Sequence, residues 1–445
     1  MLIEGFLLFA FLVFAFQFLQ LQWARGRYPP GPFPLPILGN LWLLNFALKR
    51  ETLVKLTNIY GNIYTIWLGT TPVVVLNGCK AVKEGLITYS EETSGRPLLP
   101  LFTELMGDKG VFMTTGPIWK QQKRFIMMAL RNLGVGKKIL ENRIQEEAHY
   151  LLKVFKSKKG SPFDPRTPIV KAVSNIICNF VFGHRFSEED AHFNKLLKTI
   201  HMIVYVPGSV WGRAYDSFPT IMQKFQKPYQ QLFEHNKFMH NFVKDKMQSH
   251  KERWEEGNEP QDLSKDNSSS IFSEENMVQI AVDLLIGGAE TSTTTLYWGL
   301  LYLLKYPDVQ GRLPYTNAVL HEIVRYSNVT ITGPLRKCLK DIVIMGFPIG
   351  KVKLSLSLSL PPSLPLSLPP CLSPPAHPQQ LAVRRRACVG ESLARIELFI
   401  FFTNLLRSFK YQLPPEVKEV SFEEITGTTR QPLPYNLCAF PREAT

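Results

Sequence analysis

The sequence predicts a mainly helical protein with a small β region, preceded by an N-terminal apolar helix. The chain has 445 residues, of which 45% are hydrophobic, enough for a large buried core. A long apolar stretch at 273–306 has start and stop signals of one helix, whereas 63–68 and 71–76 are short β-branched runs bounded by glycine. This composition excludes a disordered chain, collagen and a small disulfide scaffold as descriptions of the whole.

The N-terminal apolar run extends over residues 5–21 and is broken only by two glutamines. Its length is at the short end for crossing a bilayer core of roughly 30 Å. Arg25 and Arg27 follow it, which favours a cytoplasmic location for the rest of the chain. A cleaved signal peptide is the alternative, but a basic region before the run and a small-residue cleavage site are lacking. We therefore expect an uncleaved transmembrane anchor at 1–24.

A proline-rich hinge is expected at 25–40, because five prolines lie between Pro29 and Pro36. Proline fixes φ and lacks an N–H group, so this segment is stiff and not helical. A generic linker would have the same physical properties. The folded body would then occupy 41–445.

Charge and cysteine content restrict the class of protein. The net charge of +14 suggests an acidic partner or a negatively charged surface. The six cysteines are scattered and include no C-x-x-C pair, which indicates a reducing compartment and argues against a structural zinc site.

The long helix has clear ends and a weak middle. Ser273 is placed to cap its N-terminus, and Pro307 stops it. In the middle, Gly287 and Gly288 each cost about 1 kcal/mol relative to alanine. The run 291–295 consists of poor helix formers whose hydroxyls can bond to carbonyls one turn back. Such a turn is typical of a kinked core helix or of a functional site.

Two charged features lie on predicted helices. Glu290 is in the weak turn, and a carboxylate in a buried helix is costly unless it has a partner or a function. Both a satisfied core glutamate and a functional one remain open. Glu322 and Arg325 share a helix face at i, i+3, where they can form an ion pair, although such pairs are common.

Cys388 is the cysteine most suited to chemistry. It lies after three arginines and just before a predicted helix, an environment that lowers the pKa of a thiol. Gly390 allows a bulky group to approach the sulfur closely. A thiolate with space beside it suits a nucleophile or a soft metal ligand, and an incidental surface cysteine in a basic patch is the alternative.

Taken together, these motifs resemble those of the cytochrome P-450 haem-thiolate monooxygenases. The matching residues are Gly287-Gly288-Ala289-Glu290-Thr291-Ser292, Glu322-x-x-Arg325 and Arg386-x-Cys388-x-Gly390. The anchor and the proline hinge resemble the microsomal family two. The stretches 129–132, 136–138 and 172–178 are most similar to its J subfamily, known as fatty-acid and arachidonate epoxygenases. The resemblance implies the cytochrome P-450 fold behind an N-terminal membrane anchor helix, with the haem-binding catalytic domain at 41–445.

The implied activity is insertion of one atom of dioxygen into a lipophilic substrate. By resemblance this is epoxidation or hydroxylation of polyunsaturated fatty acids such as arachidonate. Electrons would come from NADPH through NADPH-cytochrome reductase, or from a cytochrome b-type donor, and the cofactor would be haem b. The resemblance also implies a location at the endoplasmic reticulum membrane, with the catalytic domain on the cytoplasmic side, and no nucleic-acid partner.

The resemblance assigns roles to individual residues. Cys388 would be the axial thiolate on the haem iron, and Thr291 and Glu290 would relay protons to dioxygen. Glu322 and Arg325 would form a structural lock. Contacts to the haem, including its propionates, are assigned to Trp119, Lys123, Arg336 and Arg386. The family usually has arginine at the position of Lys123. Substrate contacts are assigned to Val111, Phe112 and Ala289.

The chain departs from the family in two places. A helix expected between Pro307 and the Glu322 helix is missing, and a Ser-, Leu- and Pro-rich insert occupies about 354–383. The insert replaces sheet strands, the third member of the lock and part of the haem loop, where Arg384 takes the position of a glycine. A translated CT-dinucleotide repeat would produce alternating Ser and Leu, so an intron in a faulty gene model explains it. Its prolines argue against a paired strand.

Two alternatives to an active enzyme follow from these departures. The first is a catalytically inactive relative, or the product of a faulty gene model, that cannot hold haem. The second is a membrane-anchored helical binding protein in which Cys388 is incidental.

Overall fold

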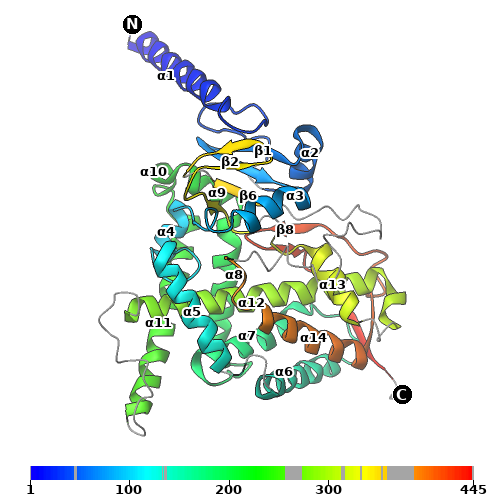
Figure 1. The fold of residues 1–445 in the computed structure, drawn as a ribbon. Helices are drawn as coiled ribbons and strands as arrows, with labels where there is room; N and C mark the ends of the chain where they lie inside the picture. The colour runs from blue at the N-terminus through cyan, green and yellow to red at the C-terminus, as the bar shows by residue number, and fades with distance from the viewer. Residues whose placement is uncertain are drawn as a thin grey trace. The chain divides into compact units, whose positions relative to one another are not determined.

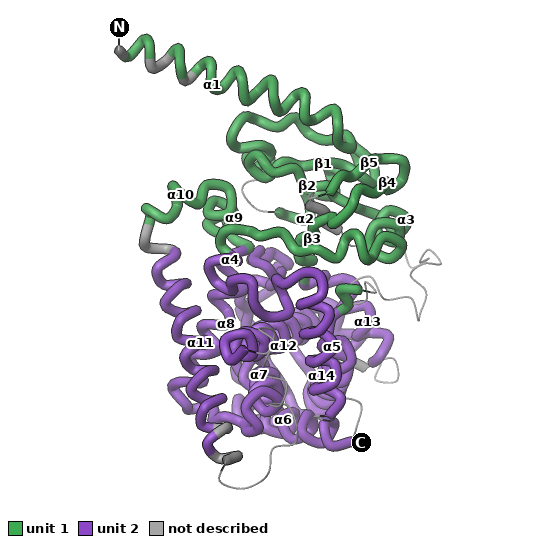
Figure 2. The backbone as a smooth tube through the Cα atoms, turned by 60° about the vertical axis from the view of Figure 1, so that its left-hand side comes forward, with its two compact units in different colours: residues 1–101, 208–225, 330–387 green, residues 102–207, 226–329, 388–445 purple. Residues whose placement is uncertain are grey.

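The computed structural model describes residues 2–44, 48–132, 134, 138–255, 273–311, 316–330, 333–351, 354–357 and 385–442. These residues form mostly helices with a few short sheets, which confirms the expected mainly α class with a small β region (Figure 1). The chain divides into two compact units made of interleaved segments (Figure 2). Unit 1 contains 1–101, 208–225 and 330–387, and unit 2 contains 102–207, 226–329 and 388–445.

Unit 2 is the larger and mainly helical unit. Its helices are α4 (Pro100–Met106, beginning at the boundary), α5 (Gly116–Asn132), α6 (Lys138–Ser157), α7 (Arg166–Phe182), α8 (Ala191–Gly208), α11 (Gln226–Glu255), α12 (Glu274–Lys305), η3 (Pro307–Gly311), α13 (Thr316–Ser327) and α14 (Glu391–Ser408). Two antiparallel pairs complete it: β7 (Phe409–Gln412) with β10 (Cys438–Pro441), and β8 (Glu424–Thr426) with β9 (Arg430–Pro432).

The centre of unit 2 is α12, which is the long helix that the sequence predicts. The Ser273 hydroxyl accepts a hydrogen bond from the Asn276 amide at its N-terminus, and the helix ends two residues before Pro307. It packs most extensively against α7. The contact is close because a Cβ on Gly288 would lie 2.5 Å from Ile177 Cδ1, so only glycine allows this approach without a shift of Ile177.

Unit 1 is built around a four-stranded sheet with the order β1-β2-β6-β3. β1 pairs with β2 in an antiparallel hairpin, β2 with β6 in parallel, and β6 with β3 antiparallel. The bounds of the elements of unit 1 are α1 (Leu2–Arg25), α2 (Arg50–Tyr60), β1 (Ile63–Leu68), β2 (Thr71–Leu76), α3 (Gly78–Lys83), η1 (Glu84–Thr88), α9 (Val210–Ser217), α10 (Pro219–Met222), β3 (Arg336–Lys337), β4 (Ile342–Ile344), β5 (Phe347–Ile349) and β6 (Leu354–Ser357).

The sheet of unit 1 is buried on both faces, which explains why β1 and β2 are continuous apolar runs. Tyr64 and Val73 point to a cluster that includes Leu53 of α2. Val74, on the opposite face, belongs to a second cluster that includes Ile344 of β4. Because side chains alternate along a strand, each strand contributes to both clusters.

The N-terminal apolar run forms the helix α1, as the sequence predicts. Across the part of the chain that the structure describes, none of the helices combines the length and apolar character needed to cross a membrane. The expected transmembrane anchor is therefore not confirmed.

The start of the Ser- and Leu-rich insert corrects one prediction. Prolines were expected to keep this segment out of a sheet, yet residues 354–357 form β6 and pair with β2 and β3. The physical reason is that the prolines begin only at Pro361, so these four residues keep every amide N–H that a ladder needs. The rest of the insert, 358–383, lies outside the described residues, as does Arg384.

Candidate functional site

One face in the middle of α12 is accessible, although most of this helix is buried. Gly287 is exposed, and Leu284, Gly288 and Thr291 are half-buried. The spacing 284, 287 and 291 places Leu284, Gly287 and Thr291 on one helix face, and Gly288 lies at its edge against Ile177 of α7. A Cβ on Gly287 would meet no atom within 4 Å, so the face opens into free space there.

Thr291 presents its hydroxyl on this accessible face. Its Oγ1 donates to the carbonyl of Gly287 at 2.6 Å, and the hydroxyls of Thr293 and Thr295 donate one turn back at 2.7 and 2.9 Å. These bonds confirm the predicted back-bonding, which lets a run of poor helix formers remain helical. A hydroxyl can donate and accept at once, so Thr291 keeps acceptor capacity toward the open face.

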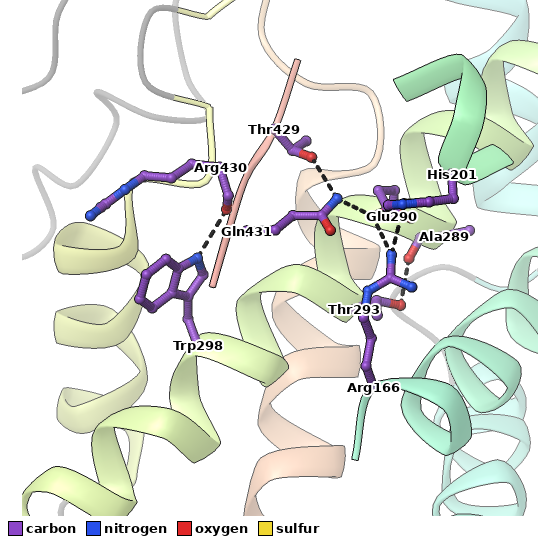
Figure 3. Close-up of polar contacts among 9 residues, drawn as sticks. All are labelled: Arg166, His201, Ala289, Glu290, Thr293, Trp298, Thr429, Arg430 and Gln431. Atoms are coloured by element: carbon purple, nitrogen blue, oxygen red, sulfur yellow. Dashed lines mark hydrogen bonds and ion pairs between the residues drawn. The ribbon is translucent and has the colours of Figure 1, made fainter. Parts of the chain in front are cut away.

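Glu290 lies in a buried polar network (Figure 3). It is 1% exposed, and its Oε1 accepts from Arg166 Nη2 at 2.8 Å and from Gln431 Nε2 at 2.5 Å. Burial raises the pKa of Glu290, but His201 and Arg166 outweigh this effect and hold the pKa below its usual value. The structure therefore pairs the Glu290 carboxylate with Arg166 in a buried ion pair.

Ala289, expected among the substrate contacts, is fully buried in the same helix. Its carbonyl accepts the Thr293 hydroxyl, as Figure 3 shows. It therefore lies off the accessible face that carries Thr291.

Cys388 precedes α14 and is exposed to solvent. The sequence predicts a depressed thiol pKa, but the structure shows the opposite. The protein atoms that surround the sulfur raise the pKa of Cys388, and Glu391 adds to this, whereas the Gly390 backbone and Lys123 lower it. The prediction is wrong because it counted the nearby arginines and the helix terminus and omitted desolvation.

Gly390 leaves space beside the sulfur. Its φ of −93° is one that any residue adopts, so its backbone does not require glycine. A Cβ at this position would lie 4.0 Å from Cys388 Sγ. The absence of a side chain here thus keeps one side of the thiol clear.

A hydrophobic cluster brings several predicted site segments of unit 2 together. Val389, next to Cys388, packs against a buried cluster that contains Ile126 of α5, and Val111, together with Leu284 of α12, packs against the same cluster. The same helix α5 carries Trp119, which is buried, and Lys123, whose Nζ lies 5.6 Å from the centre of the Trp119 ring. This distance is within the range of a cation–π interaction.

Val111 and Phe112, the expected substrate contacts, lie on a segment held by α12. Their backbone amides donate to Asp283 Oδ2 at 2.7 and 2.9 Å, and the Gly110 amide donates to Asn276 Oδ1 at 2.9 Å. Burial raises the pKa of Asp283 to about 6, although these hydrogen bonds lower it. Sequence reasoning missed Asp283 and Asn276. The one sequence feature that could have indicated them is that each is a polar residue in a largely apolar helix.

A second buried acid connects α12 to α14. Glu397 is 1% exposed, and Ser292, the residue after Thr291, donates to its Oε2 at 3.1 Å. Burial raises the pKa of Glu397 to about 8, with Ser292 acting in the opposite direction. The acid is therefore protonated at neutral pH. Nothing in the sequence singled it out.

Unit 1 contains a cluster of three arginines. Arg336 and Arg386, both predicted site residues, lie with Arg96, which sequence reasoning missed. Burial lowers the pKa of Arg336 to about 10, and burial with repulsion from Arg336 lowers that of Arg386 to about 9. The pKa of Arg96 is also depressed, by burial and then by repulsion from the other two. Three guanidinium groups that repel one another form a site suited to an acidic ligand.

These arginines are oriented by backbone carbonyls. Arg96 Nη1 donates to the carbonyls of Leu335 and Pro334, and Arg386 Nε donates to that of Ser94 at 2.7 Å. Such bonds hold the side chains in place without neutralising their charge.

Glu322 and Arg325 form the expected pair on α13. Two hydrogen bonds, from Arg325 Nε at 2.7 Å and from Nη2 at 2.5 Å, make it bidentate. The Arg325 side chain is 17% exposed and that of Glu322 is 57% exposed.

Comparison with known proteins gives a family match over most of the chain. A family model described as Cytochrome P450 matches residues 29–313, 310–354 and 385–439. The chain is 34% identical to cytochrome P450 2J2 of Homo sapiens, over 93% of this chain and 91% of that protein. It is 33% identical to cytochrome P450 2J5 of Mus musculus, with the same coverage, and 35% identical to cytochrome P450 2C23 of Rattus norvegicus, over 94% of both.

Proposed function

The chain belongs to the cytochrome P450 family of haem-thiolate monooxygenases, and we propose that it oxygenates polyunsaturated fatty acids such as arachidonate. The resemblance to family two and its J members is confirmed by the matched relatives. Epoxidation or hydroxylation of such a lipid, with electrons from NADPH delivered by NADPH-cytochrome reductase or a cytochrome b-type donor, is the reaction that this similarity supports.

The family's cofactor is haem b with a cysteine thiolate ligand, and the residues present fit it. Cys388 would supply the thiolate, because this residue is exposed before α14 and Gly390 leaves space beside its sulfur. When bound, the haem iron activates dioxygen, and the thiolate donates electron density that favours O–O cleavage. The position of this cysteine, just before α14 and beside the side-chain-free Gly390, is the observation that carries this assignment.

The acidic propionates of haem require positive partners. We assign this role to Arg336 and Arg386, together with Arg96, because their three positive charges lie close together and are oriented by backbone carbonyls. Trp119 and Lys123 on α5 are the further haem contacts that we propose, with Lys123 supplying charge without the bidentate fork of arginine.

Proton delivery is assigned to Thr291 and Glu290. The Thr291 hydroxyl lies on the accessible face of α12, where it can hold a proton at Oγ1, and Glu290 is an ionised carboxylate at the preceding position. Val111 and Phe112 are proposed as substrate contacts, held by Asp283. Ala289, being buried, would act only by shaping this turn of α12. The Glu322–Arg325 pair is proposed as the structural lock of α13.

We further propose a location at the endoplasmic reticulum membrane with the catalytic part on the cytoplasmic side. The apolar helix α1, whose last residue is Arg25, and Arg27 after it support this orientation.

The test of the cofactor assignment is spectroscopic. Reduced, CO-treated protein should show the red-shifted Soret band of thiolate ligation, and Cys388→Ser should abolish it. Folded wild-type protein without this band would refute the enzyme assignment. The substrate assignment is tested by incubation with arachidonate, NADPH and reductase, followed by product analysis. Protein that shows the Soret band but forms no oxygenated arachidonate would refute the substrate only.

A second candidate is a catalytically inactive relative, or the product of a faulty gene model. It is favoured by the segment 355–384, which the family model leaves unmatched between its blocks. Sequencing the transcript across codons 306–390 separates the two cases. An abundant mature message that contains the insert would exclude a gene-model error, and loss of the insert from the message would support it.

A further inference from the structure

Residues 110–112, which include the proposed substrate contacts, place their backbone directly against side chains of α12. Gly110 has a φ of +75°, and a Cβ there would overlap Asp283 Oδ2 and lie 2.7 Å from Gln279 Cγ. Both the backbone angle and this close approach require glycine. The position of the segment therefore depends on how Asp283 and Gln279 are held.

Asp283 is the end point of a chain of hydrogen bonds. Its Oδ2 accepts the amides of Val111 and Phe112, and its Oδ1 accepts Gln279 Nε2 at 2.9 Å. Burial raises the pKa of Asp283 to about 6, so the group is a carboxylate at pH 7.5 and can only accept. Gln279 must therefore turn its NH2 group to Asp283 and its carbonyl oxygen to the opposite side.

His240 on α11 supplies the donor that this carbonyl oxygen needs. Its Nε2 lies 2.8 Å from Gln279 Oε1, and its Nδ1 lies 2.9 Å from the carbonyl oxygen of Asn236, one turn back. Because an amide oxygen only accepts, Nε2 carries a proton. The chain of donors thus runs from His240 through Gln279 to Asp283.

Loss of this donor would be felt at the other end of the chain. The Gln279 side chain is 2% exposed, and a buried amide oxygen without a donor is costly. The amide can relieve this cost by rotation, which turns its oxygen toward the Asp283 carboxylate and replaces a hydrogen bond by repulsion. The hold of Asp283 on the amides of Val111 and Phe112 then weakens.

We infer that His240 is a positioning residue for substrate binding. Through Gln279 it fixes Asp283, and through Asp283 it fixes the segment that contains Val111 and Phe112. This rests on the proposed function, which assigns these two residues to the substrate.

A separate anchor keeps the segment attached when this chain is broken. The Gly110 amide donates to Asn276 Oδ1 at 2.9 Å, and the same oxygen accepts from Gln122 Nε2 of α5 at 3.0 Å. Removal of the His240 donor should therefore loosen Val111 and Phe112 more than Gly110.

The alternative is that His240 only ties α11 to α12. A structural tie of this kind would lower global stability and would leave the local hold on the segment unchanged. A positioning residue also changes backbone protection at Val111 and Phe112 and the binding of substrate.

The experiment uses full-length, haem-loaded protein at pH 7.5 with His240→Leu, His240→Gln, Gln279→Leu and the double variant H240L/Q279L. The first readout is amide hydrogen exchange. H240L should speed exchange at Val111 and Phe112 about tenfold, in line with the loss of one hydrogen bond. H240Q, which retains an N–H donor, should stay within about twofold of wild type. In the Q279L background H240L should have no further effect, because it acts through Gln279.

The second readout separates binding from chemistry. H240L should raise KM for arachidonate about fivefold and leave kcat within about twofold, because the chain acts on a binding segment and not on the reacting atoms. H240Q should restore most of the wild-type KM.

A matched control is His235→Leu. His235 lies on the same helix, is half-buried like His240, and has its Nδ1 2.8 Å from Thr199 Oγ1 of α8. This contact has no part in the chain to Asp283, so neither exchange at Val111 nor KM should change.

Unchanged exchange at Val111 and Phe112 in H240L, or an equal rise in H235L, would overturn the inference, as would a loss confined to kcat. If H240L does not fold, His240→Asn is polar but too short to reach Gln279 and should give the same rise in exchange; wild-type exchange in H240N would overturn the inference as well. The exchange readout needs no substrate. Protein that shows the expected exchange but oxygenates no arachidonate would therefore refute the proposed substrate and leave the chain from His240 to the segment supported.

Discussion

Replacement of the buried acid Glu397 by glutamine should change how stability depends on pH. The carboxyl has a pKa of about 8 in the folded protein against an ordinary value of 4.5. Between these values the folded state holds a proton that the unfolded state releases. Stability therefore falls as pH rises through this window, by up to about 5 kcal/mol in total at 1.36 kcal/mol per pH unit.

Glu397→Gln removes this dependence and retains an acceptor for the Ser292 hydroxyl. The variant should be close to wild type near pH 5 and more stable by about 3 kcal/mol near pH 7.5. Urea unfolding of both proteins, followed by circular dichroism across this range, measures the difference. Glu416→Gln, an exposed carboxylate of the same unit, is the control and should run parallel to wild type. Parallel curves for E397Q as well would refute the reasoning.

Three further predictions concern stability and cofactor retention. Gly287→Ala should stabilise the fold by up to about 1 kcal/mol, because the added Cβ meets open space. Gly288→Ala should destabilise the fold by about 1–3 kcal/mol, because the added Cβ overlaps Ile177. Thermal unfolding that ranks the two variants in the opposite order would contradict this. Asp283→Ala should cost about 3 kcal/mol, because the half-buried amides of Val111 and Phe112 lose their acceptor. It should also speed proteolysis near residue 111, and an unchanged cleavage rate would argue against the role of Asp283 in holding this segment. Arg96→Leu should stabilise the haem-free protein by relieving repulsion but weaken haem retention, so equal haem loss from variant and wild type would exclude its role.

The helix α12 illustrates how far sequence reasoning extends. Its cap, its end and its back-bonding hydroxyls were predicted because each depends on residues within one helical turn. The thiol pKa of Cys388 was predicted wrongly because desolvation depends on the packing of atoms that are remote in sequence.

Insert residues 354–357 also depend on residues that are remote in sequence. Alternating Ser and Leu is compatible with a strand, and only the presence of β2 and β3 as neighbours decides that these residues pair. Strand formation depends on such neighbours more than on intrinsic preference.

By itself the sequence determined the mainly helical class, the position of α12, and Cys388 as the thiol placed before a helix. The tertiary structure alone decided which partners the buried charges have. Arg166 and Glu290 are 124 residues apart, and Val111 and Asp283 are 172 apart. A buried carboxylate in a sequence signals that some donor is needed, but the donor's identity depends on which helices pack together.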